Sequence, residues 1–462
     1  MASVATSNSN LRWLAGARGS DGPIYAAIVE ALERAVREGE LHPGDRLPAQ
    51  RAIADHLGVD LTTVTRAYSA ARARGLVEGA VGRGTFVRAP VLDRGEGLVD
   101  LSMNLPPPPD GVSLGGLLRE TIDAILQRAD AAILMAYHPG FGTLGQRMAG
   151  ARWLAPCVGE VAADRILVSP GAQTALSAVL STLCRPGDVV AAEPLTYPGF
   201  INVARRLGLR LLACPADDEG LIPEAFERLC AEERPAAVYL SPTMQNPTGR
   251  TMTPARRAAV ARLCAAGGVW IVEDDPYSRL LDEPPPALAS LAPDWTFHIA
   301  TLSKCLSPGL RVAYLVCPRA WTERVADALR AAALMPAPLM AAVATRWVQE
   351  GGAERLLAGV RAETRARRAM AARVLPEARG AAESIHVWLP LAEARASERL
   401  RLAAQARGVA LVTAEAFALE PDHPTGARIS LGGVGQRGVL ERALIALSEL
   451  ARAGSPARTD IV

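Results

Sequence analysis

The chain has 462 residues, half of them hydrophobic, which is enough for two or three domains with at least one large buried core. No apolar run approaches the roughly 20 residues of a membrane span and no signal-peptide pattern opens the chain, so a cytoplasmic location without membrane association is expected. The net charge of +2 is too small to indicate nucleic-acid binding by itself, and the seven cysteines, which form no CxxC pair, argue against a disulfide framework or a zinc site.

One compositional feature is more specific. The chain has fifty basic residues, of which forty-nine are arginine and one is lysine, Lys304. Arginine stays protonated and is a poor amine nucleophile, whereas a lysine amine can lose its proton and form an imine with an aldehyde cofactor. A chain that avoids lysine this thoroughly is expected to keep one where the chemistry is covalent. The alternative is a chance survivor on the surface, and the residues around Lys304 argue against it.

The first predicted elements form a helix-turn-helix followed by a wing. After a flexible polar tail over residues 1–20, apolar residues at helical spacing predict a helix over 23–39. Two short helices over 47–58 and 60–75, separated by a tight turn at Gly58, have helix-turn-helix spacing. Residues 76–78 and 85–87 are predicted to pair as a hairpin.

The rest of the chain predicts a larger α/β part. Residues 89–103, rich in proline, glycine and charge, are interpreted as a linker. Over about 104–330, helical stretches alternate with short apolar runs, which predicts a mainly parallel sheet covered by helices. These runs lie at 165–168, 189–192, 237–240, 269–272 and 312–317. Long helices, then strands over 386–389 and 409–412, predict a small α+β domain over about 331–452, within a region that extends to 462.

Residues 22–87 resemble the GntR-type winged helix-turn-helix nearly end to end. The matching segments are GELHPGDRLP at 39–48, LGV at 57–59, TTV at 62–64, GLV at 75–77 and GRGTFV at 82–87, together with Arg51 and Tyr68. The resemblance implies a domain over 21–88 that binds a double-stranded DNA operator. The residues it assigns to the DNA interface are Arg51, Thr62, Thr63, Thr65 and, on the wing, Arg83.

Two features of this domain qualify the DNA-binding prediction. Leu61 stands where many relatives carry a DNA-reading arginine, which leaves base specificity open. Residues 11–90 hold eleven arginines against nine acidic residues, so the electrostatic field is weak and affinity can depend on dimerisation. A winged helix used for protein contacts is the alternative, but it gives Arg51, Thr62, Thr63 and Arg83 no reason to share DNA-facing positions.

Motifs in the larger part fit an aromatic aldehyde that bears a phosphate. The sequence TLSK ends at Lys304, which is expected to form the imine, and an arginine follows seven residues later. The sequence SPGAQ at 169–173 follows an apolar run and opens a helix, where backbone amides and the positive end of the helix dipole form an anion site. The predicted phosphate ligands are Gly171, Ala172, Gln173, Thr301, Ser303 and Arg311.

Other motifs fit the aromatic ring of the same ligand. Asp274, in the sequence EDDPY, is expected to pair with a protonated ring nitrogen, while Tyr277 and Asn246 reach the ring hydroxyl and Tyr197 stacks on the ring face. Taken singly, each of these residues has an ordinary structural explanation as a turn, a cap or a packing residue. Their joint occurrence with the chain's single lysine favours the binding site.

From about residue 100 onward the chain resembles a fold type I aminotransferase of the kynurenine/aminoadipate branch, and with the N-terminal reader the whole chain resembles the MocR family of regulators. The resemblance implies pyridoxal 5'-phosphate as the cofactor, no metal, and a homodimer with cofactor sites at the subunit boundary. Tyr137, in the sequence YHPGFG, matches the tyrosine that contacts phosphate from the partner subunit. Arg428 matches the arginine that binds a substrate carboxylate, a contact in which Asn246 is also expected to take part.

The predicted function is a DNA-binding transcription regulator that senses a small amine or amino acid through imine exchange at Lys304. An active aminotransferase with a DNA-binding head is the main alternative, because Lys304, Asp274, Tyr277 and Arg428 would serve transamination equally well. A regulator that responds to pyridoxal phosphate itself is the third. Regulation is favoured because a DNA reader has little reason to be fused to a purely metabolic enzyme.

Overall fold

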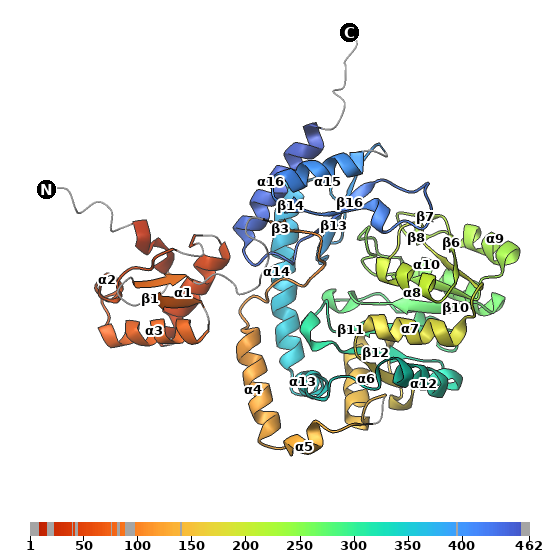
Figure 1. Cartoon of the computed structure of the whole chain (residues 1–462), viewed down its shortest axis with the longest axis horizontal. Helices are drawn as coiled ribbons and strands as arrows, with labels where there is room; N and C mark the ends of the chain where they lie inside the picture. Colours follow the sequence, from red (N-terminus) through yellow and green to blue (C-terminus); the bar gives the residue numbers. More distant parts are fainter. Residues whose placement is uncertain are drawn as a thin grey trace, which may run out of the picture. The chain divides into compact units, whose positions relative to one another are not determined.

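The computed structural model describes residues 9–15, 23–38, 40–41, 45–74, 76–80, 84–87, 98–138, 141–393 and 396–453. The chain divides into two compact units, residues 1–99 with 434–443 and residues 100–433 with 444–462 (Figure 1). No helix in the described ranges has both the length and the apolar character that a membrane span requires.

The first unit contains the predicted winged helix-turn-helix. Helices α1 (Ile24–Glu38), α2 (Gln50–Leu57) and α3 (Leu61–Ala73) are followed by the antiparallel hairpin of β1 (Val77–Ala80) and β2 (Gly84–Val87), and η1 (Ser9–Leu14) precedes them. Gly58 ends α2 with a left-handed φ of 61°, and the Asp60 carboxylate caps α3 by accepting from the Thr62 amide at 2.9 Å. Apolar side chains of all three helices and both strands form one core.

The second helix begins three residues later than predicted. Leu47 donates its amide to the Thr85 carbonyl at 2.8 Å, and Val87 donates to Asp45 at 2.9 Å, so residues 45–47 pair with β2 instead of joining the helix. Pro48 then separates this extended stretch from α2, because a proline disfavours the helical conformation in the residue before it, here Leu47.

The larger unit is built around a sheet whose strand order is β4-β12-β11-β10-β9-β5-β6 within the described part of the chain. Strand β12 runs antiparallel to both of its neighbours, and the other pairings are parallel. The strands are β4 (Ile166–Ser169), β5 (Val189–Ala192), β6 (Arg210–Ala213), β9 (Ala237–Leu240), β10 (Trp270–Asp274), β11 (Thr296–Thr301) and β12 (Ala313–Val316). The mainly parallel α/β prediction is confirmed, and β6 and β11 are strands of this sheet that were not among the predicted apolar runs.

Helices cover both faces of this sheet, as the continuous apolar strands require. Helices α7 (Ala172–Leu183), α8 (Pro198–Arg206) and α12 (Thr322–Ala333) pack on one face. Helices α6 (Leu144–Val158) and α13 (Pro338–Gln349), with α9 (Pro223–Glu233) and α10 (Pro254–Gly267), pack on the other. Successive strand residues therefore enter different cores, with Leu167 in one and Ile166 and Val168 in the other.

The C-terminal part contains an antiparallel sheet of β13 (His386–Pro390), β16 (Gly426–Ser430) and β15 (Val412–Thr413). The strand predicted over 409–412 is split, because β14 (Val409–Ala410) belongs to a different sheet from β15. The remaining elements are β3 (Val99–Asp100), α4 (Leu114–Leu126), α5 (Ala131–Leu134), β7 (Ala216–Asp217), β8 (Gly220–Leu221), α11 (Leu288–Leu291), α14 (Gly352–Val374), α15 (Ala396–Ala406), α16 (Arg437–Ala453) and the short η2 to η6 (Ala163–Arg165, Ser278–Leu280, Pro308–Leu310, Arg319–Trp321, Ala414–Ala416).

The end of the predicted linker is built into the larger unit. Leu101 is fully buried, its amide donates to the Ala410 carbonyl at 2.8 Å, and its carbonyl accepts from the Ser430 amide at 2.9 Å. We call residues Asp100–Asn104 the strap. Residues 89–97 of the same predicted linker lie outside the described residues.

Candidate functional site

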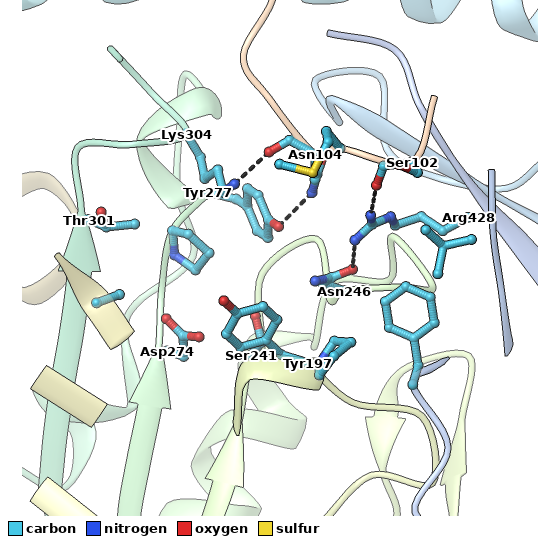
Figure 2. A pocket seen from close by; sticks show the side chains of 16 residues that line it. Ser102, Asn104, Tyr197, Ser241, Asn246, Asp274, Tyr277, Thr301, Lys304 and Arg428 are labelled. Atoms are coloured by element: carbon cyan, nitrogen blue, oxygen red, sulfur yellow. Dashed lines mark hydrogen bonds between the residues drawn. The ribbon is translucent and has the colours of Figure 1, made fainter. Parts of the chain in front are cut away.

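A cavity of about 320 Å³ lies where the parallel strands β9, β10 and β11 end (Figure 2). This edge is where open α/β sheets bind ligands, because loops from neighbouring strands diverge there. The cavity is lined by Ser102, Met103, Asn104, Ala172, Tyr197, Pro198, Ser241, Asn246, Asp274, Pro276, Tyr277, Thr301, Lys304, Val412, Phe417 and Arg428.

Asp274, the last residue of β10, provides a buried carboxylate to this cavity. Its Oδ2 accepts a hydrogen bond from the Tyr239 hydroxyl at 2.6 Å, and its Oδ1 is buried without a partner among the described residues. Burial raises the pKa of Asp274 to about 6. A buried oxygen of this kind indicates that a ligand donates a hydrogen bond to it, and a protonated ring nitrogen is a donor of that type.

Lys304 extends into the cavity from the loop after β11, and its Nζ donates to the Asn104 carbonyl (Figure 2). Burial, with a smaller contribution from the positive charge of Arg428, lowers the pKa of Lys304 to about 8. An amine in this range is partly neutral near neutral pH and can therefore act as a nucleophile.

Two of the predicted phosphate ligands, Gly171 and Arg311, meet at the start of α7. Gly171 has a φ of 97°, and a Cβ placed on it would lie 2.5 Å from Nη2 of Arg311, so the guanidinium lies directly against this turn. The Thr301 hydroxyl donates to the Ser303 hydroxyl at 3.0 Å, and Thr301 lines the same cavity as Ala172 at the start of α7. Amides at a helix start and a guanidinium are donors of the kind that bind an anion.

Gln173 makes a different contact from the one predicted. Its Nε2 donates to the Gly199 carbonyl at 2.8 Å and its Oε1 accepts from the Tyr197 hydroxyl at 3.2 Å. Gln173 is not among the cavity-lining residues, so it positions the Tyr197 ring that lines the cavity. Direct contact between Gln173 and a phosphate stays a prediction.

Arg428, on β16, closes the opposite end of the cavity. Its Nη1 donates to Oδ1 of Asn246 at 2.8 Å, its Nη2 donates to the Ser102 carbonyl, and its guanidinium lies 5.0 Å from the centre of the Phe417 ring. Because a guanidinium only donates, the Asn246 amide is oriented with Oδ1 toward Arg428, which leaves Nδ2 as the donor for a ligand. Nε of Arg428 is buried and has no partner among the described residues.

Asn104 connects the strap to Tyr277 and His386. Its Nδ2 donates to the Tyr277 hydroxyl at 2.8 Å and lies 3.3 Å from Nδ1 of His386. Burial lowers the pKa of His386 to about 3, so the ring is neutral and its Nε2 donates to the Gln245 carbonyl at 3.2 Å. Since Tyr277 accepts from Asn104, its own proton remains available to a ligand oxygen.

Sequence reasoning missed Ser102, Asn104, Tyr239 and His386. The first two lie in and next to the segment interpreted as linker, and the other two lie inside strands that read as ordinary core. Tyr137, whose predicted phosphate contact is with a partner subunit, is 82% exposed and does not line the cavity of its own chain. Its predicted role is not tested by a single chain.

The donor set fits pyridoxal phosphate. The cavity combines an amine of lowered pKa at Lys304, an unpaired carboxylate oxygen at Asp274 and the anion site at the start of α7. These groups match the aldehyde, the ring nitrogen and the phosphate of the cofactor, respectively.

Four of the predicted DNA-binding residues lie on α2 and α3 of the first unit. Arg51 and Thr62 are exposed, Thr63 is half-buried, and the Thr62 hydroxyl donates to Asp60 at 2.9 Å. Thr65 is exposed and donates to Oε1 of Gln50 at 2.8 Å, which links the two helices. Leu61 is 39% exposed at the start of α3. Arg83 lies outside the described residues.

Comparison with known proteins assigns both parts of the chain. Residues 96–447 match the family "Aminotransferase class I and II", and residues 24–87 match "Bacterial regulatory proteins, gntR family". The HTH-type transcriptional regulator YdeF of Bacillus subtilis is 30% identical over 454 residues, which cover 96% of this chain and 97% of that protein.

Solved structures resemble the larger part. A kynurenine aminotransferase of Pyrococcus horikoshii superposes with a TM-score of 0.73 at 24% identity, over 79% of this chain and 93% of its own. The α-aminoadipate aminotransferase LysN of Thermus thermophilus, complexed with N-(5'-phosphopyridoxyl)-L-leucine, has a TM-score of 0.71 at 25% identity, over 84% of this chain and 98% of its own.

Proposed function

We propose that this chain, which belongs to the aminotransferase class I and II family, senses a small amine or amino acid at Lys304. The premise is that it is a pyridoxal phosphate-dependent transcription regulator of the gntR (MocR) type. The effector would be a primary amine, and Arg428 favours one that also carries a carboxylate. The response would be a changed affinity of the gntR-type domain for its DNA operator.

The observation that carries the proposal is the position of Lys304 between two binding ends, Asp274 with the α7 anion site on one side and Arg428 with Asn246 on the other. When bound, pyridoxal phosphate supplies an aldehyde that can pass from the lysine amine to the amine of another molecule. The site therefore has room for a cofactor at one end and a carboxylate at the other.

Each residue has a definite task in this proposal. Asp274 Oδ1 would accept from the ring nitrogen, and the charge of the carboxylate would keep that nitrogen protonated. Arg311 and the α7 amides would bind the phosphate, while Asn246 Nδ2 and the Tyr277 hydroxyl would bind the ring oxygen. Tyr197 would stack on the ring, and Arg428 would bind the effector carboxylate.

An active aminotransferase is the second candidate, and the same pKa of Lys304 favours it. An amine with a pKa of about 8 can serve as the general base that transamination requires as well as a nucleophile. Nothing about the position of Lys304 separates sensing from turnover, so the two functions must be distinguished by experiment.

We also propose that the working unit is a homodimer in which Tyr137 contacts the phosphate of the partner subunit. The proposed domain organisation is a reader over 21–88, a connection over 89–103 whose last residues, 100–103, are built into the larger unit, and a cofactor-binding part from 104 onward. The exposure of Tyr137 supports this arrangement, because an aromatic side chain that is 82% exposed in one chain is available to a second one.

The test uses the full-length protein loaded with pyridoxal phosphate, titrated with a panel of amino acids and amines in the presence of 2-oxoglutarate. Absorbance, consumption of the keto acid and affinity for a fragment of the chain's own promoter would be followed in the same samples. We expect a stoichiometric spectral change, a shift in DNA affinity and no sustained consumption. Sustained consumption with unchanged DNA affinity would establish the enzyme instead, and a DNA response to pyridoxal phosphate alone would establish a cofactor sensor.

A further inference from the structure

The strap contacts Arg428, to which the carboxylate of the proposed effector would bind, and Lys304, which the amine of the effector would displace from the cofactor. The Ser102 carbonyl accepts from Nη2 of Arg428, and the Asn104 carbonyl accepts from Nζ of Lys304 (Figure 2). The Asn104 side chain also donates to Tyr277 at 2.8 Å. The guanidinium expected to bind the effector's carboxylate and the lysine amine that forms the imine are therefore both hydrogen-bonded to the strap.

The strap is seated closely against the C-terminal part. A Cβ placed on Gly432 would lie 1.8 Å from the Leu105 carbonyl oxygen, directly after the strap, and one on Gly433 would lie 3.2 Å from that of Asp100. Asp100 Oδ1 in turn accepts from the Ser102 amide at 2.8 Å, which fixes the turn that directs the Ser102 carbonyl. The position of the strap thus depends on glycines at 432 and 433 as well as on Arg428.

A carboxylate would compete directly with the Ser102 carbonyl. A guanidinium binds a carboxylate through two parallel N–H groups, and Nη2 belongs to both of the pairs that offer this geometry. A carboxylate would bring a negative charge and two acceptor oxygens to the guanidinium, whereas the Ser102 carbonyl offers one neutral acceptor. Because Arg428 is buried and its Nη1 is occupied by Asn246, an incoming carboxylate meets Nη2 and also Nε, which has no partner in the described part of the chain.

We propose that the strap is a latch that a carboxylate releases: an amino acid bound at Arg428 replaces the Ser102 carbonyl and frees residues 100–104. This inference rests on the proposed function and deepens it, because it names the effector class. An amine without a carboxylate would leave the Arg428 contact in place, so amino acids would release the latch and simple amines would not. The strap is covalently continuous with the gntR-type domain, which provides the route by which its release changes DNA affinity.

The first experiment isolates the carboxylate. Full-length protein would be loaded with N-(5'-phosphopyridoxyl)-L-leucine or with N-(5'-phosphopyridoxyl)-3-methylbutylamine, which differ only in the carboxylate and cannot react with Lys304. Hydrogen exchange would be measured at the amides of Leu101 and Ser430, which form the strap's hydrogen bonds to its neighbours. We expect exchange about tenfold faster with the leucine adduct, with amides of β9 and β10 unchanged in both samples.

A second experiment releases the strap without any ligand. Gly432→Ala should displace the strap, because the new Cβ would overlap the Leu105 carbonyl. Gly145→Ala, in α6, is the matched control, since a Cβ there meets nothing within 4 Å. Without any adduct, we expect Gly432→Ala to show fast hydrogen exchange in the strap. We also expect its DNA affinity to equal that of the wild-type protein loaded with the leucine adduct.

The outcomes separate the latch from the proposed function. Equal strap exchange with the two adducts would overturn the latch, even if DNA affinity responds to amino acids. Faster exchange with the leucine adduct and in Gly432→Ala, with unchanged DNA affinity, would support the latch as a carboxylate sensor and contradict regulation of DNA binding. Failure of both adducts to bind would contradict the proposed function, and the latch with it.

Discussion

The Tyr239 hydroxyl donates a 2.6 Å hydrogen bond to Oδ2 of Asp274, so half of this buried carboxylate is paired inside the protein and the other half faces the cavity. Both residues lie on neighbouring parallel strands, β9 and β10, which fixes their separation. The carboxylate is thus positioned before any ligand arrives, at the cost of burying a charge that is only partly compensated.

Asp274→Asn should stabilise the cofactor-free protein and weaken its cofactor binding. The folded pKa of Asp274, about 6, lies above its unfolded value of 3.8, so folding favours the protonated form. The stability from this group is present below pH 3.8 and is lost as pH rises through 6, a loss of roughly 3 kcal/mol at most. Urea unfolding should therefore show Asp274→Asn more stable than wild type at pH 8, with a smaller difference at pH 5.

The same variant should bind pyridoxal phosphate at least about tenfold more weakly, because it loses a charge-assisted hydrogen bond. Tyr239→Phe is the matched comparison, since it removes the partner of Oδ2 and keeps the charge. An Asp274→Asn protein with unchanged cofactor affinity would show that the ring nitrogen lies elsewhere.

Covalent attachment of pyridoxal phosphate should depend on pH through Lys304. Because burial lowers the pKa of its amine to about 8, attachment to the cofactor-free protein should accelerate up to about pH 8 and then level off. Stopped-flow absorbance would measure the rate. Lys304→Arg should abolish attachment while circular dichroism and basal DNA affinity stay as in wild type, and loss of folding in that variant would instead make Lys304 a structural residue.

Arg428→Gln should discriminate between amino acids and amines. It removes a charge-assisted pair of hydrogen bonds, so the affinity for L-leucine should fall by about 10- to 100-fold, whereas that for 3-methylbutylamine should change by less than about twofold. An absorbance titration of the loaded protein would compare the two. Equal losses for both ligands would place the carboxylate away from Arg428.

DNA binding should depend on Arg51 and much less on Arg74. Arg51 is exposed on α2, and Arg51→Ala should weaken binding to promoter DNA and lower its salt slope by about 1, as expected for one lost phosphate contact. Arg74 forms an ion pair with Glu33 at 3.1 Å, which makes Arg74→Ala the matched control. Affinity measured over a salt series would decide, and an unchanged slope in Arg51→Ala would remove Arg51 from the interface.

Asp60 should contribute to the stability of helix α3, which it caps. Its carboxylate accepts from the amide and the hydroxyl of Thr62, both at 2.9 Å, and these bonds lower the pKa of Asp60. Asp60→Ala should destabilise α3, and Asp60→Asn should recover most of the lost stability. Amide exchange in α3 would report both changes, and no difference between the two variants would show that the cap contributes little.

The sequence was sufficient to predict the two-part architecture, because the relevant signals are local. Helical spacing of apolar residues, a glycine turn at Gly58 and short buried runs each lie within one element. The chain's single lysine and the short motifs around Asp274 and Asn246 likewise consist of neighbouring residues, so the cofactor could be inferred from them. The start of α2 was predicted too early because the pairing of residues 45–47 with β2 is not local.

The contacts that distinguish this site were decided by the tertiary structure. Asn104 and Lys304 are 200 residues apart, and Ser102 and Arg428 are 326 apart, yet the fold brings each pair into hydrogen-bond contact. A polar contact between distant segments leaves no periodic pattern in either one, so the strap read only as linker. The sequence by itself determined which chemical groups are available, and the packing of the strap on β14 and β16 determined which of them are already engaged before an effector binds.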